Sequence, residues 1–310
     1  MRKSKEAIGG KTPQAKFRMY LQLEKALQPN SVEAYLSDIE KLAVFFEHKN
    51  DRLINATTDE LRGFLTSLAD IGISARSQAR IMSSLRAFYE FLVLDEYIEN
   101  DPTSLLKSPK IPSRLPDVLT IQEIDDMINL IDLSKKEGQR NRAIIEILYS
   151  CGLRVSELCG LRMSDLHREE LFIRVTGKGD KQRLIPISQR AIAELEAYFT
   201  DRSFIKIKPG FEDHIFISER LKKPLSRIMV FYMIKQLARE VGIKKNISPH
   251  TFRHSFATHL LEGGANLRVI QAMLGHESIA TTEIYTHIDR TRMREEIMMF
   301  HPHNRPKGTI

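Results

Sequence analysis

The N-terminal third of the chain repeats apolar residues at steps of three and four. The first run comprises Val32, Tyr35, Leu36, Ile39, Leu42, Ala43 and Phe46. This spacing predicts an amphipathic helix that starts near Ser31. Thr57 and Glu60 then fit a capping box at the start of a second helix, which Gly72 ends. The pattern therefore predicts that the N-terminal third of the chain folds into helices that pack together.

A third predicted helix ends before the turn at Asn100-Asp101-Pro102. Its inward residues are Ile81, Leu85, Phe88 and Leu92, and its surface carries Arg76, Arg80 and Arg86. Arginines on a helix usually form a solvated face, but in a basic protein they can also lie along phosphates. We expect a helical domain over residues 14–105, preceded by a basic extension over residues 1–13.

Residues 106–117 form the predicted linker between two domains. Their prolines and basic residues alternate as Lys107, Pro109, Lys110, Pro112, Arg114 and Pro116. Closely spaced prolines cannot propagate a helix. Lys107 and Lys110 are candidate contacts to a polyanion.

The second domain, over residues 118–288, mixes helices with a small β element. Thr120 and Glu123 fit a capping box, and a helix is predicted over 139–150. Two β-type runs, 171–175 and 183–187, flank T-G-K-G-D-K-Q and predict a hairpin. Further helices are expected near Ser188, Ser226, Ser248 and Ser278, with one short strand over 214–217. The fold class is mainly α, with a small antiparallel sheet in the second domain.

Composition changes this picture modestly. A chain of 310 residues suits two domains, and a net charge of +7 with a pI near 9.3 favours a polyanionic partner. The sequence has neither a long uncharged apolar run nor a signal peptide, so we expect a cytoplasmic protein without membrane contact. Cys151 and Cys159 lie eight residues apart, about 12 Å along a helix, which is too far for a disulfide. We expect reduced thiols.

Two arginines are predicted beside helix N-termini. Gly152 breaks one helix, and Arg154 follows just before or in the first turn of the next. A cation is unfavourable there unless an anion lies between it and the helix end, and a phosphate diester is such an anion. The alternative is a surface arginine paired with Glu157. In S-P-H-T-F-R-H, the cap at Ser248 places His250 and Arg253 one turn apart on one helix face.

A metal site is the competing interpretation of the same histidines. His250 and His254 have the i, i+4 spacing of zinc ligands on a helix. A general-base glutamate and a third ligand are missing nearby, and Arg253 would place a permanent cation against the metal. We therefore predict no metal and no cofactor, and we assign His254 and His259 to helix packing.

The remaining candidates are a histidine, a tyrosine and basic residues of the hairpin. Gly275 ends a helix, His276 follows it, and Ser278 caps a short helix that carries Tyr285. The hairpin basic residues are Lys178, Lys181 and Arg183. A tyrosine near a helix end is usually a packing residue. The basic hairpin residues either form a solvated turn or reach into a DNA groove, and Lys181 and Arg183 are candidate DNA contacts. Jointly, however, these parts suit a phosphoryl transfer in which arginines neutralise charge, a histidine moves a proton, and a lysine protonates the leaving oxygen.

These motifs resemble those of the tyrosine site-specific recombinases of the phage integrase family, most closely the Xer recombinases. G-L-R-V-S-E-L corresponds to the segment with the first catalytic arginine, T-G-K-G-D-K-Q-R to the hairpin, H-T-F-R-H to the H-x-x-R box, and L-G-H with I-Y-T-H to the last box. The resemblance implies the catalytic residues Arg154, Lys178, His250, Arg253, His276 and the nucleophile Tyr285, with Glu157 in support. Similarity continues through Y-L-S-D-I and L-R-A-F-Y-E-F-L in the first domain.

The resemblance also implies a SAM-like core-binding domain and a recombinase catalytic domain that clamp a double-stranded DNA site. A homo- or hetero-tetramer on two sites would exchange strands through a 3′-phosphotyrosyl bond and a Holliday junction, without ATP or metal, in the resolution of chromosome dimers. The tail over residues 289–310 would pack on a neighbouring protomer. A septal DNA translocase or another accessory protein is an implied partner, although the ending F-H-P-H-N-R-P-K-G departs from the Xer pattern.

Three other functions fit parts of the sequence. The integrase or transposase of a mobile element uses the same chemistry on different DNA. A type IB topoisomerase uses the same nucleophile but rejoins the same strand. A non-catalytic DNA-binding protein is disfavoured because every catalytic position is filled.

Overall fold

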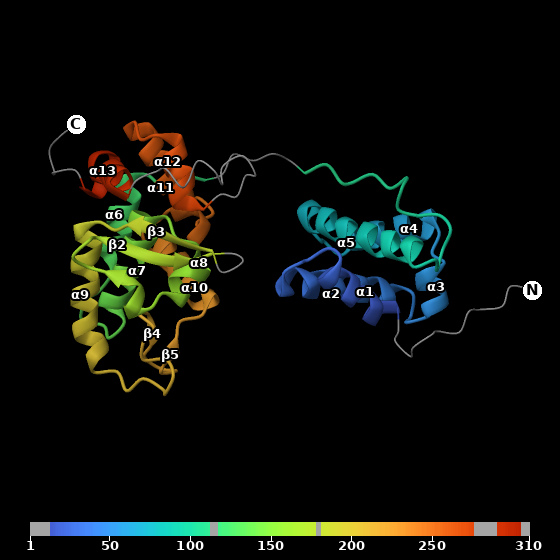
Figure 1. Cartoon of the computed structure of the whole chain (residues 1–310), viewed down its shortest axis with the longest axis horizontal. Helices are drawn as coiled ribbons and strands as arrows, with labels where there is room; N and C mark the ends of the chain where they lie inside the picture. The colour runs from blue at the N-terminus through green and yellow to red at the C-terminus, as the bar shows by residue number, and fades with distance from the viewer. Residues whose placement is uncertain (1–12, 112–116, 178–180, 276–289, 305–310) are drawn as a thin grey trace, which may run out of the picture. The chain divides into compact units, whose positions relative to one another are not determined.

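The computed structural model describes residues 13–111, 117–177, 181–275 and 290–304 (Figure 1). The chain divides into two compact units, Met1–Arg114 and Leu115–Ile310. Each unit has its own hydrophobic core. Among the described helices, none has the length and apolar character needed to cross a bilayer. The expected two-domain, mainly helical architecture is confirmed.

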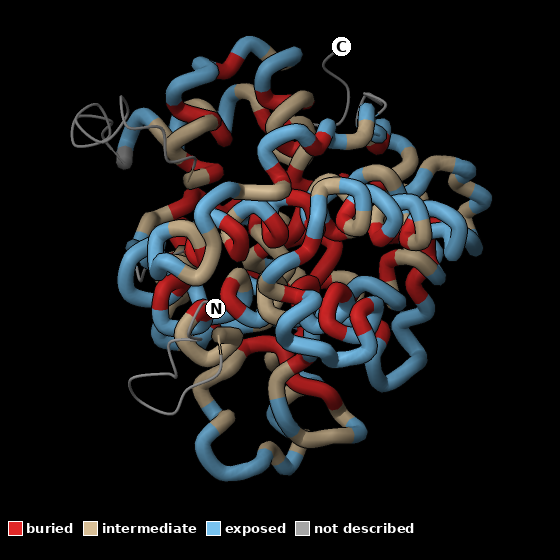
Figure 2. Tube along the Cα trace, turned by 90° about the vertical axis from the view of Figure 1, so that its right-hand side faces the viewer, coloured by how far each residue is buried: buried red, intermediate tan, exposed pale blue. Residues whose placement is uncertain are grey.

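The first unit is entirely helical over its described residues. Its helices are α1 (Pro13–Leu23), α2 (Pro29–Phe45), α3 (Asn50–Ile54), α4 (Thr58–Asp70) and α5 (Ala75–Leu94). The predicted capping box is present, because Thr57 and Glu60 bond each other's backbone N–H groups at the start of α4. Buried and exposed positions alternate along these helices, as Figure 2 shows. Amphipathic packing therefore builds this unit, although the sequence pattern had not identified α1.

Arg80 joins α5 to α2 through a buried carboxylate. Asp38 is fully buried and accepts hydrogen bonds from both terminal guanidinium nitrogens of Arg80, one of them at 2.9 Å. The hydroxyl of Ser84 donates to the same carboxylate at 2.9 Å. Replacing one member of a buried pair leaves the other charge uncompensated. Arg80, a predicted DNA contact, therefore holds its own domain together.

The start of the predicted linker belongs to the first core. Leu106 is buried among the apolar residues of this unit, and its carbonyl accepts a hydrogen bond from Arg86 at 2.9 Å. Arg86 thus also has a structural contact, while Lys107 and Lys110 are exposed beyond it. The domain boundaries predicted from sequence stay predictions at the level of single residues.

The second unit packs helices around a three-stranded antiparallel sheet. Its elements are α6 (Ile121–Leu130), α7 (Gly138–Cys151), α8 (Val155–Gly160), η1 (Met163–Asp165), β1 (Leu166–His167), β2 (Phe172–Thr176), β3 (Gln182–Pro186), α9 (Gln189–Ser203), β4 (Ile217–Ser218), β5 (Lys223–Pro224), α10 (Arg227–Glu240), α11 (Pro249–Gly263), α12 (Leu267–Leu274), α13 (Arg290–Phe300) and η4 (Pro302–Asn304). The sheet order is β1-β2-β3, and the expected hairpin is β2-β3. Of the strand expected over 214–217, only Ile217 lies in a strand, β4, and His214 forms an isolated bridge with Arg162.

Helix α7 runs through the centre of this unit, between α9 and α11 (Figure 1). Every residue from Ala143 to Cys151 is buried, including Glu146. Such a helix is shielded on all sides and shows little amphipathic contrast. Cys151 is buried and Cys159 half-buried, and both are free thiols, as expected.

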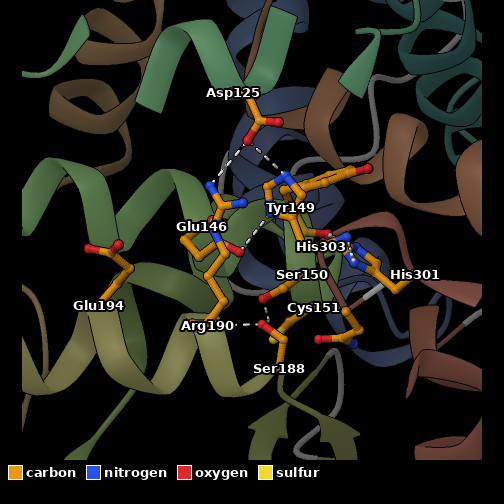
Figure 3. A network of polar contacts seen from close by, with 12 residues as sticks. Asp125, Glu146, Tyr149, Ser150, Cys151, Ser188, Arg190, Glu194, His301 and His303 are labelled. Atoms are coloured by element: carbon orange, nitrogen blue, oxygen red, sulfur yellow. Dashed lines mark hydrogen bonds and ion pairs between the residues drawn. The ribbon is translucent and has the colours of Figure 1, made fainter. Parts of the chain in front are cut away.

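The C-terminal segment packs on its own unit in this single chain. Ile297 of α13 is buried in the second core, and His303 of η4 lies between two carboxylates (Figure 3). His303 Nδ1 is 2.8 Å from Glu146 Oε1, and Nε2 is 3.3 Å from Asp125 Oδ1. Arg190 reaches both carboxylates at 3.1 Å. The histidines of the unusual ending therefore anchor the segment in its own chain, and packing on a neighbouring protomer stays a prediction.

Candidate active site

Arg154 stands where the chain leaves α7. Gly152 ends that helix in the left-handed conformation with φ of 58°, and Arg154 is the N-cap residue of α8. A Cβ at position 152 would lie 2.4 Å from the ring of Phe256, so only glycine fits this turn. The predicted break and the predicted position of Arg154 are both confirmed.

Glu157 holds two arginines with one carboxylate. Its Oε1 accepts from Nη1 of Arg154 and from Nη1 of Arg183, each at 2.9 Å. Its Oε2 accepts from the backbone N–H of Arg154 at 2.8 Å and from Nη2 of Arg183 at 2.9 Å. Burial alone would raise the pKa of Glu157, but the bonds from Arg183 and then Arg154 lower it below its usual range. The carboxylate is ionised and its acceptor sites are filled.

Helix α11 presents the histidine and arginine of the H-x-x-R segment. Pro249 occupies the first helical position as predicted, but the hydroxyl of Ser248 makes no capping bond to the backbone. Instead Thr251 Oγ1 accepts from the backbone N–H of Ser248 at 3.1 Å. His250 is exposed and Arg253, one turn later, is buried. The helix start is therefore confirmed at Pro249, with a different cap, and the common face of His250 and Arg253 stays a prediction.

Arg253 is anchored by two helix ends. It donates to the carbonyl of Gly152 at 2.8 Å and to the carbonyl of Leu274. Burial first, and then the charge of Arg154, lower its pKa to about 10, so it stays protonated at neutral pH. Within the described part of the chain, Arg154 and Arg253 each use two of five N–H donors in hydrogen bonds. The free donors and the excess positive charge can bind the non-bridging oxygens of a phosphate diester.

Arg183 was expected to contact DNA, but its side chain points into the protein. Its side chain is only 15% exposed, and its Nε donates to the carbonyl of Met273 at 2.9 Å while both Nη atoms bind Glu157. The alternation of inward and outward residues along β3 could have indicated that Arg183 points inward. Arg183 shares a face with Ile185, which is fully buried, and its cross-strand neighbour Val175 is buried too.

Other predicted site residues are partly outside the described residues. Lys178, His276 and Tyr285 fall in segments 178–180 and 276–289, which the structure does not describe. Arg76 and Lys181 are exposed, and their DNA contacts stay predictions. The predicted packing residues are described: His254 is half-buried, and His259 is buried with its Nδ1 2.8 Å from the hydroxyl of Tyr149.

The described segments contain neither a cluster of side chains that could bind a metal ion nor a reactive thiol. They contain no group of three or more histidine, cysteine or acidic side chains arranged to hold a metal ion. Burial raises the pKa of Cys151 to about 12 and that of Cys159 to about 11, so both thiols are protonated at neutral pH.

Comparisons with known proteins identify the family. Residues 117–292 match the phage integrase family, and residues 15–96 match the N-terminal SAM-like domain of phage integrases. The chain belongs to the phage integrase family. Among its curated relatives, tyrosine recombinase XerD of Halalkalibacterium halodurans is 40% identical over 290 residues, covering 92% of this chain and 96% of that protein. XerD of Staphylococcus haemolyticus is 38% identical over 287 residues, covering 91% and 96%.

Solved recombinase structures share the fold. XerH site-specific recombinase bound to difH substrate, in a pre-cleavage complex, aligns with a TM-score of 0.66 and 23% identity, covering 93% of this chain and 84% of that one. A lambda integrase dimer bound to a COC′ core site aligns with a TM-score of 0.68 and 20% identity, covering 86% and 94%. This member of the family is a tyrosine recombinase, an enzyme that transfers DNA strands.

Proposed function

We propose that Arg154 and Arg253 bind the scissile phosphate of a recombination site and that Tyr285 is the nucleophile. The observation that carries this proposal is the convergence of Arg154, Arg183 and Arg253 around one carboxylate, Glu157. A site with three guanidinium groups and one acid has excess positive charge, and Arg154 and Arg253 keep donors for a ligand. A phosphate diester supplies the missing negative charge and matches the planar donors of arginine.

The proposed reaction exchanges one phosphodiester for another. The phenolic oxygen of Tyr285 attacks phosphorus, the bond from phosphorus to the 5′ oxygen breaks, and a 3′-phosphotyrosyl bond forms. Lys178 gives its proton to the departing 5′ oxygen, and a histidine, His250 or His276, takes the phenolic proton. The free 5′ hydroxyl then attacks the phosphotyrosyl bond of the partner duplex. Because a phosphodiester is replaced at each step, no ATP is consumed.

We further propose the Xer role for this chain, namely recombination at a chromosomal site that resolves chromosome dimers. The identity of about 40% to XerD proteins over most of both chains supports it. Four protomers would act on two sites, with Arg76, Lys107, Lys110 and Lys181 as predicted DNA contacts. The partner protomers would be copies of this chain or a paralogue, and a septal DNA translocase or another accessory protein would control exchange in the cytoplasm.

A nicked suicide substrate tests the nucleophile. Cleavage releases a short 5′ hydroxyl fragment that diffuses away, so the covalent adduct accumulates on a denaturing gel. The wild-type chain should form this adduct, and Tyr285→Phe should bind the same DNA without forming it. An adduct with Tyr285→Phe would refute the assignment.

The DNA site separates the Xer role from that of a mobile-element integrase. The Tyr285→Phe protein, cross-linked in its own cell, should recover DNA from a single site near the chromosome terminus. Recovery of the ends of a mobile element would overturn the Xer role while leaving the chemistry intact. Relaxation of supercoiled DNA without exchange between two marked sites would instead indicate a topoisomerase.

A further inference from the structure

The carboxyl end of α12 binds three arginines on three successive carbonyls. Arg183 donates to Met273 at 2.9 Å, Arg253 donates to Leu274, and Arg154 donates to Gly275 at 3.3 Å. The last carbonyls of a helix lack partners within the helix and carry the negative end of its dipole. This helix end is therefore a platform that attracts and orients the guanidinium groups.

Arg183 has a different place on this platform from the other two arginines. All three of its side-chain nitrogens are engaged, two by Glu157 and one by Met273. Both carboxylate oxygens of Glu157 that accept from Arg183 also accept from Arg154. Oε1 accepts from the Arg154 side chain, and Oε2 accepts from the Arg154 backbone N–H. The orientation of Arg154 thus depends on a carboxylate that Arg183 holds in place.

The glycine that ends α12 makes room for this arrangement. Gly275 has φ of 63°, and a Cβ there would lie 3.2 Å from both Cδ and Nε of Arg183. A side chain at this position would crowd the Arg183 stem. The glycine is therefore matched to the arginine as well as to the helix end.

We propose that Arg183 is a positioning residue for strand cleavage, acting on Arg154 through Glu157 and tying β3 to the end of α12. This inference rests on the proposed function, in which Arg154 binds the scissile phosphate. Arg154 is 37% exposed, so its long side chain would sample other rotamers without a fixed partner. Phosphoryl transfer depends on cationic groups that are in place before the reaction. If Glu157 loses its bonds to Arg183, it holds Arg154 less firmly, and the cleavage rate falls although no DNA contact is removed.

Single-turnover cleavage of the suicide substrate, with binding measured separately, tests the proposal. Arg183→Met should cleave about 10- to 100-fold more slowly, by analogy with the loss of a residue that orients a metal-binding side chain. Its DNA affinity and the salt dependence of that affinity should match the wild-type chain. Arg174→Met is the matched control, because Arg174 lies on the partner strand β2 and pairs with Asp165 at 3.0 Å. It should cleave within about twofold of wild type, as expected for a surface pair.

A double-mutant cycle identifies the route of the effect. Residues that act through one another give non-additive losses. Glu157→Gln with Arg183→Met should therefore cleave no more slowly than the slower single variant. If the two losses multiply, Arg183 acts independently of Glu157 and the proposal is wrong. A salt slope reduced by about one in Arg183→Met would show a direct phosphate contact and would also overturn it.

Arg183→Lys provides a second test that keeps the charge. An ammonium cannot span both oxygens of Glu157 and the carbonyl of Met273 at once, so this variant should still cleave slowly at wild-type affinity. Cleavage at the wild-type rate would show that charge alone suffices and would contradict positioning. Failure of the wild-type chain to form any adduct would sink the proposed function itself, whereas equal adduct formation by wild type and Arg183→Met would sink only the role of Arg183.

Discussion

The carbonyl of Gly152 accepts a hydrogen bond from Nη1 of Arg253 at 2.8 Å. The residue that ends α7 therefore also fixes an arginine that lies 101 positions later in the sequence. Gly152 has φ of 58°, and its missing side chain leaves space for Phe256 of α11, the helix that carries Arg253. Gly152 therefore determines three features: the turn after α7, the packing of α7 against α11, and the position of the Arg253 guanidinium group.

We expect Gly152→Ala to damage both stability and activity. A left-handed alanine costs about 1 to 2 kcal/mol, and overpacking against Phe256 costs about 1 to 3 kcal/mol more. Chemical denaturation should show a loss of about 2 to 5 kcal/mol, with slower strand cleavage. Gly242→Ala is the control, because φ is +82° there and a Cβ would meet open space. If the two variants lost equal stability, the clash with Phe256 would not matter.

Substituting either site arginine should slow cleavage, but only one substitution should strongly reduce stability. By analogy with removal of one oxyanion donor, Arg154→Ala and Arg253→Ala should each cost about 2.7 to 4 kcal/mol of transition-state stabilisation. Arg253 is also buried on the carbonyls of Gly152 and Leu274, and an unsatisfied buried carbonyl costs about 1 to 3 kcal/mol. The midpoint temperature of thermal unfolding should therefore fall clearly for Arg253→Ala and only slightly for Arg154→Ala. Wild-type cleavage by either variant would contradict the phosphate clamp.

Strand cleavage should not require a divalent metal ion. In the proposed reaction, arginines neutralise the charge that a metal neutralises in other phosphoryl transferases. Suicide-substrate cleavage in excess EDTA should proceed at the untreated rate. Loss of activity that a specific divalent cation restores would disprove this expectation.

Local sequence signals predicted much of the fold. The capping boxes at Thr57 and Thr120 and the glycines that end α7 and α12 depend on residues within one turn, so a short window contains them. The β2-β3 hairpin followed from strand alternation around a glycine-containing turn. Helix α1 was not identified, the strand expected over 214–217 meets β4 only at Ile217, and β5 is too short to give a periodic signal.

The arrangement of the site was less predictable because it depends on contacts between distant elements. The sequence identified Arg154 and Arg253 but placed Arg183 on DNA, because a basic hairpin residue often points to solvent. Only the packing of β3 against α8 and α12 brings Arg183 to Glu157 and Met273. The same limit applies to Arg80, whose partner Asp38 lies on another helix.

The pH dependence of stability tests the charge of Glu157. Its pKa is lowered in the folded state despite burial, because Arg183 and Arg154 bind the carboxylate. A lowered folded pKa stabilises the protein above the unfolded value of about 4.3 and is lost as pH falls through the folded value. The stability deficit of Glu157→Gln should therefore be full at neutral pH and shrink below about pH 4.3. Urea denaturation across this range measures it, and a deficit that stays constant would contradict the ionised pair.

The opposite kind of group, a buried neutral base, is His301 beside η4. Burial, and then the proximity of His303, lower its pKa to about 3. Its Nδ1 accepts from the backbone N–H of His303 at 3.2 Å, so Nε2 carries the proton and donates to the carbonyl of Tyr149 at 3.3 Å. Protonation would place a charge in this buried cluster. The contact of the C-terminal segment with α7 therefore requires the neutral imidazole.

We expect wild-type stability to fall as the pH drops from about 6.5, where an unfolded histidine takes up its proton, because the folded chain cannot bind that proton until about pH 3. One such histidine removes about 2 kcal/mol between about pH 6.5 and 5. His301→Phe keeps a ring against Tyr149 and Phe256, loses two hydrogen bonds, and removes the titration. It should be less stable at pH 7 yet lose less on acidification from about pH 6.5 to 5, where His259, whose pKa burial also lowers, still contributes in both chains. Denaturation midpoints at several pH values compare the two chains, and parallel curves would show that His301 does not govern this loss.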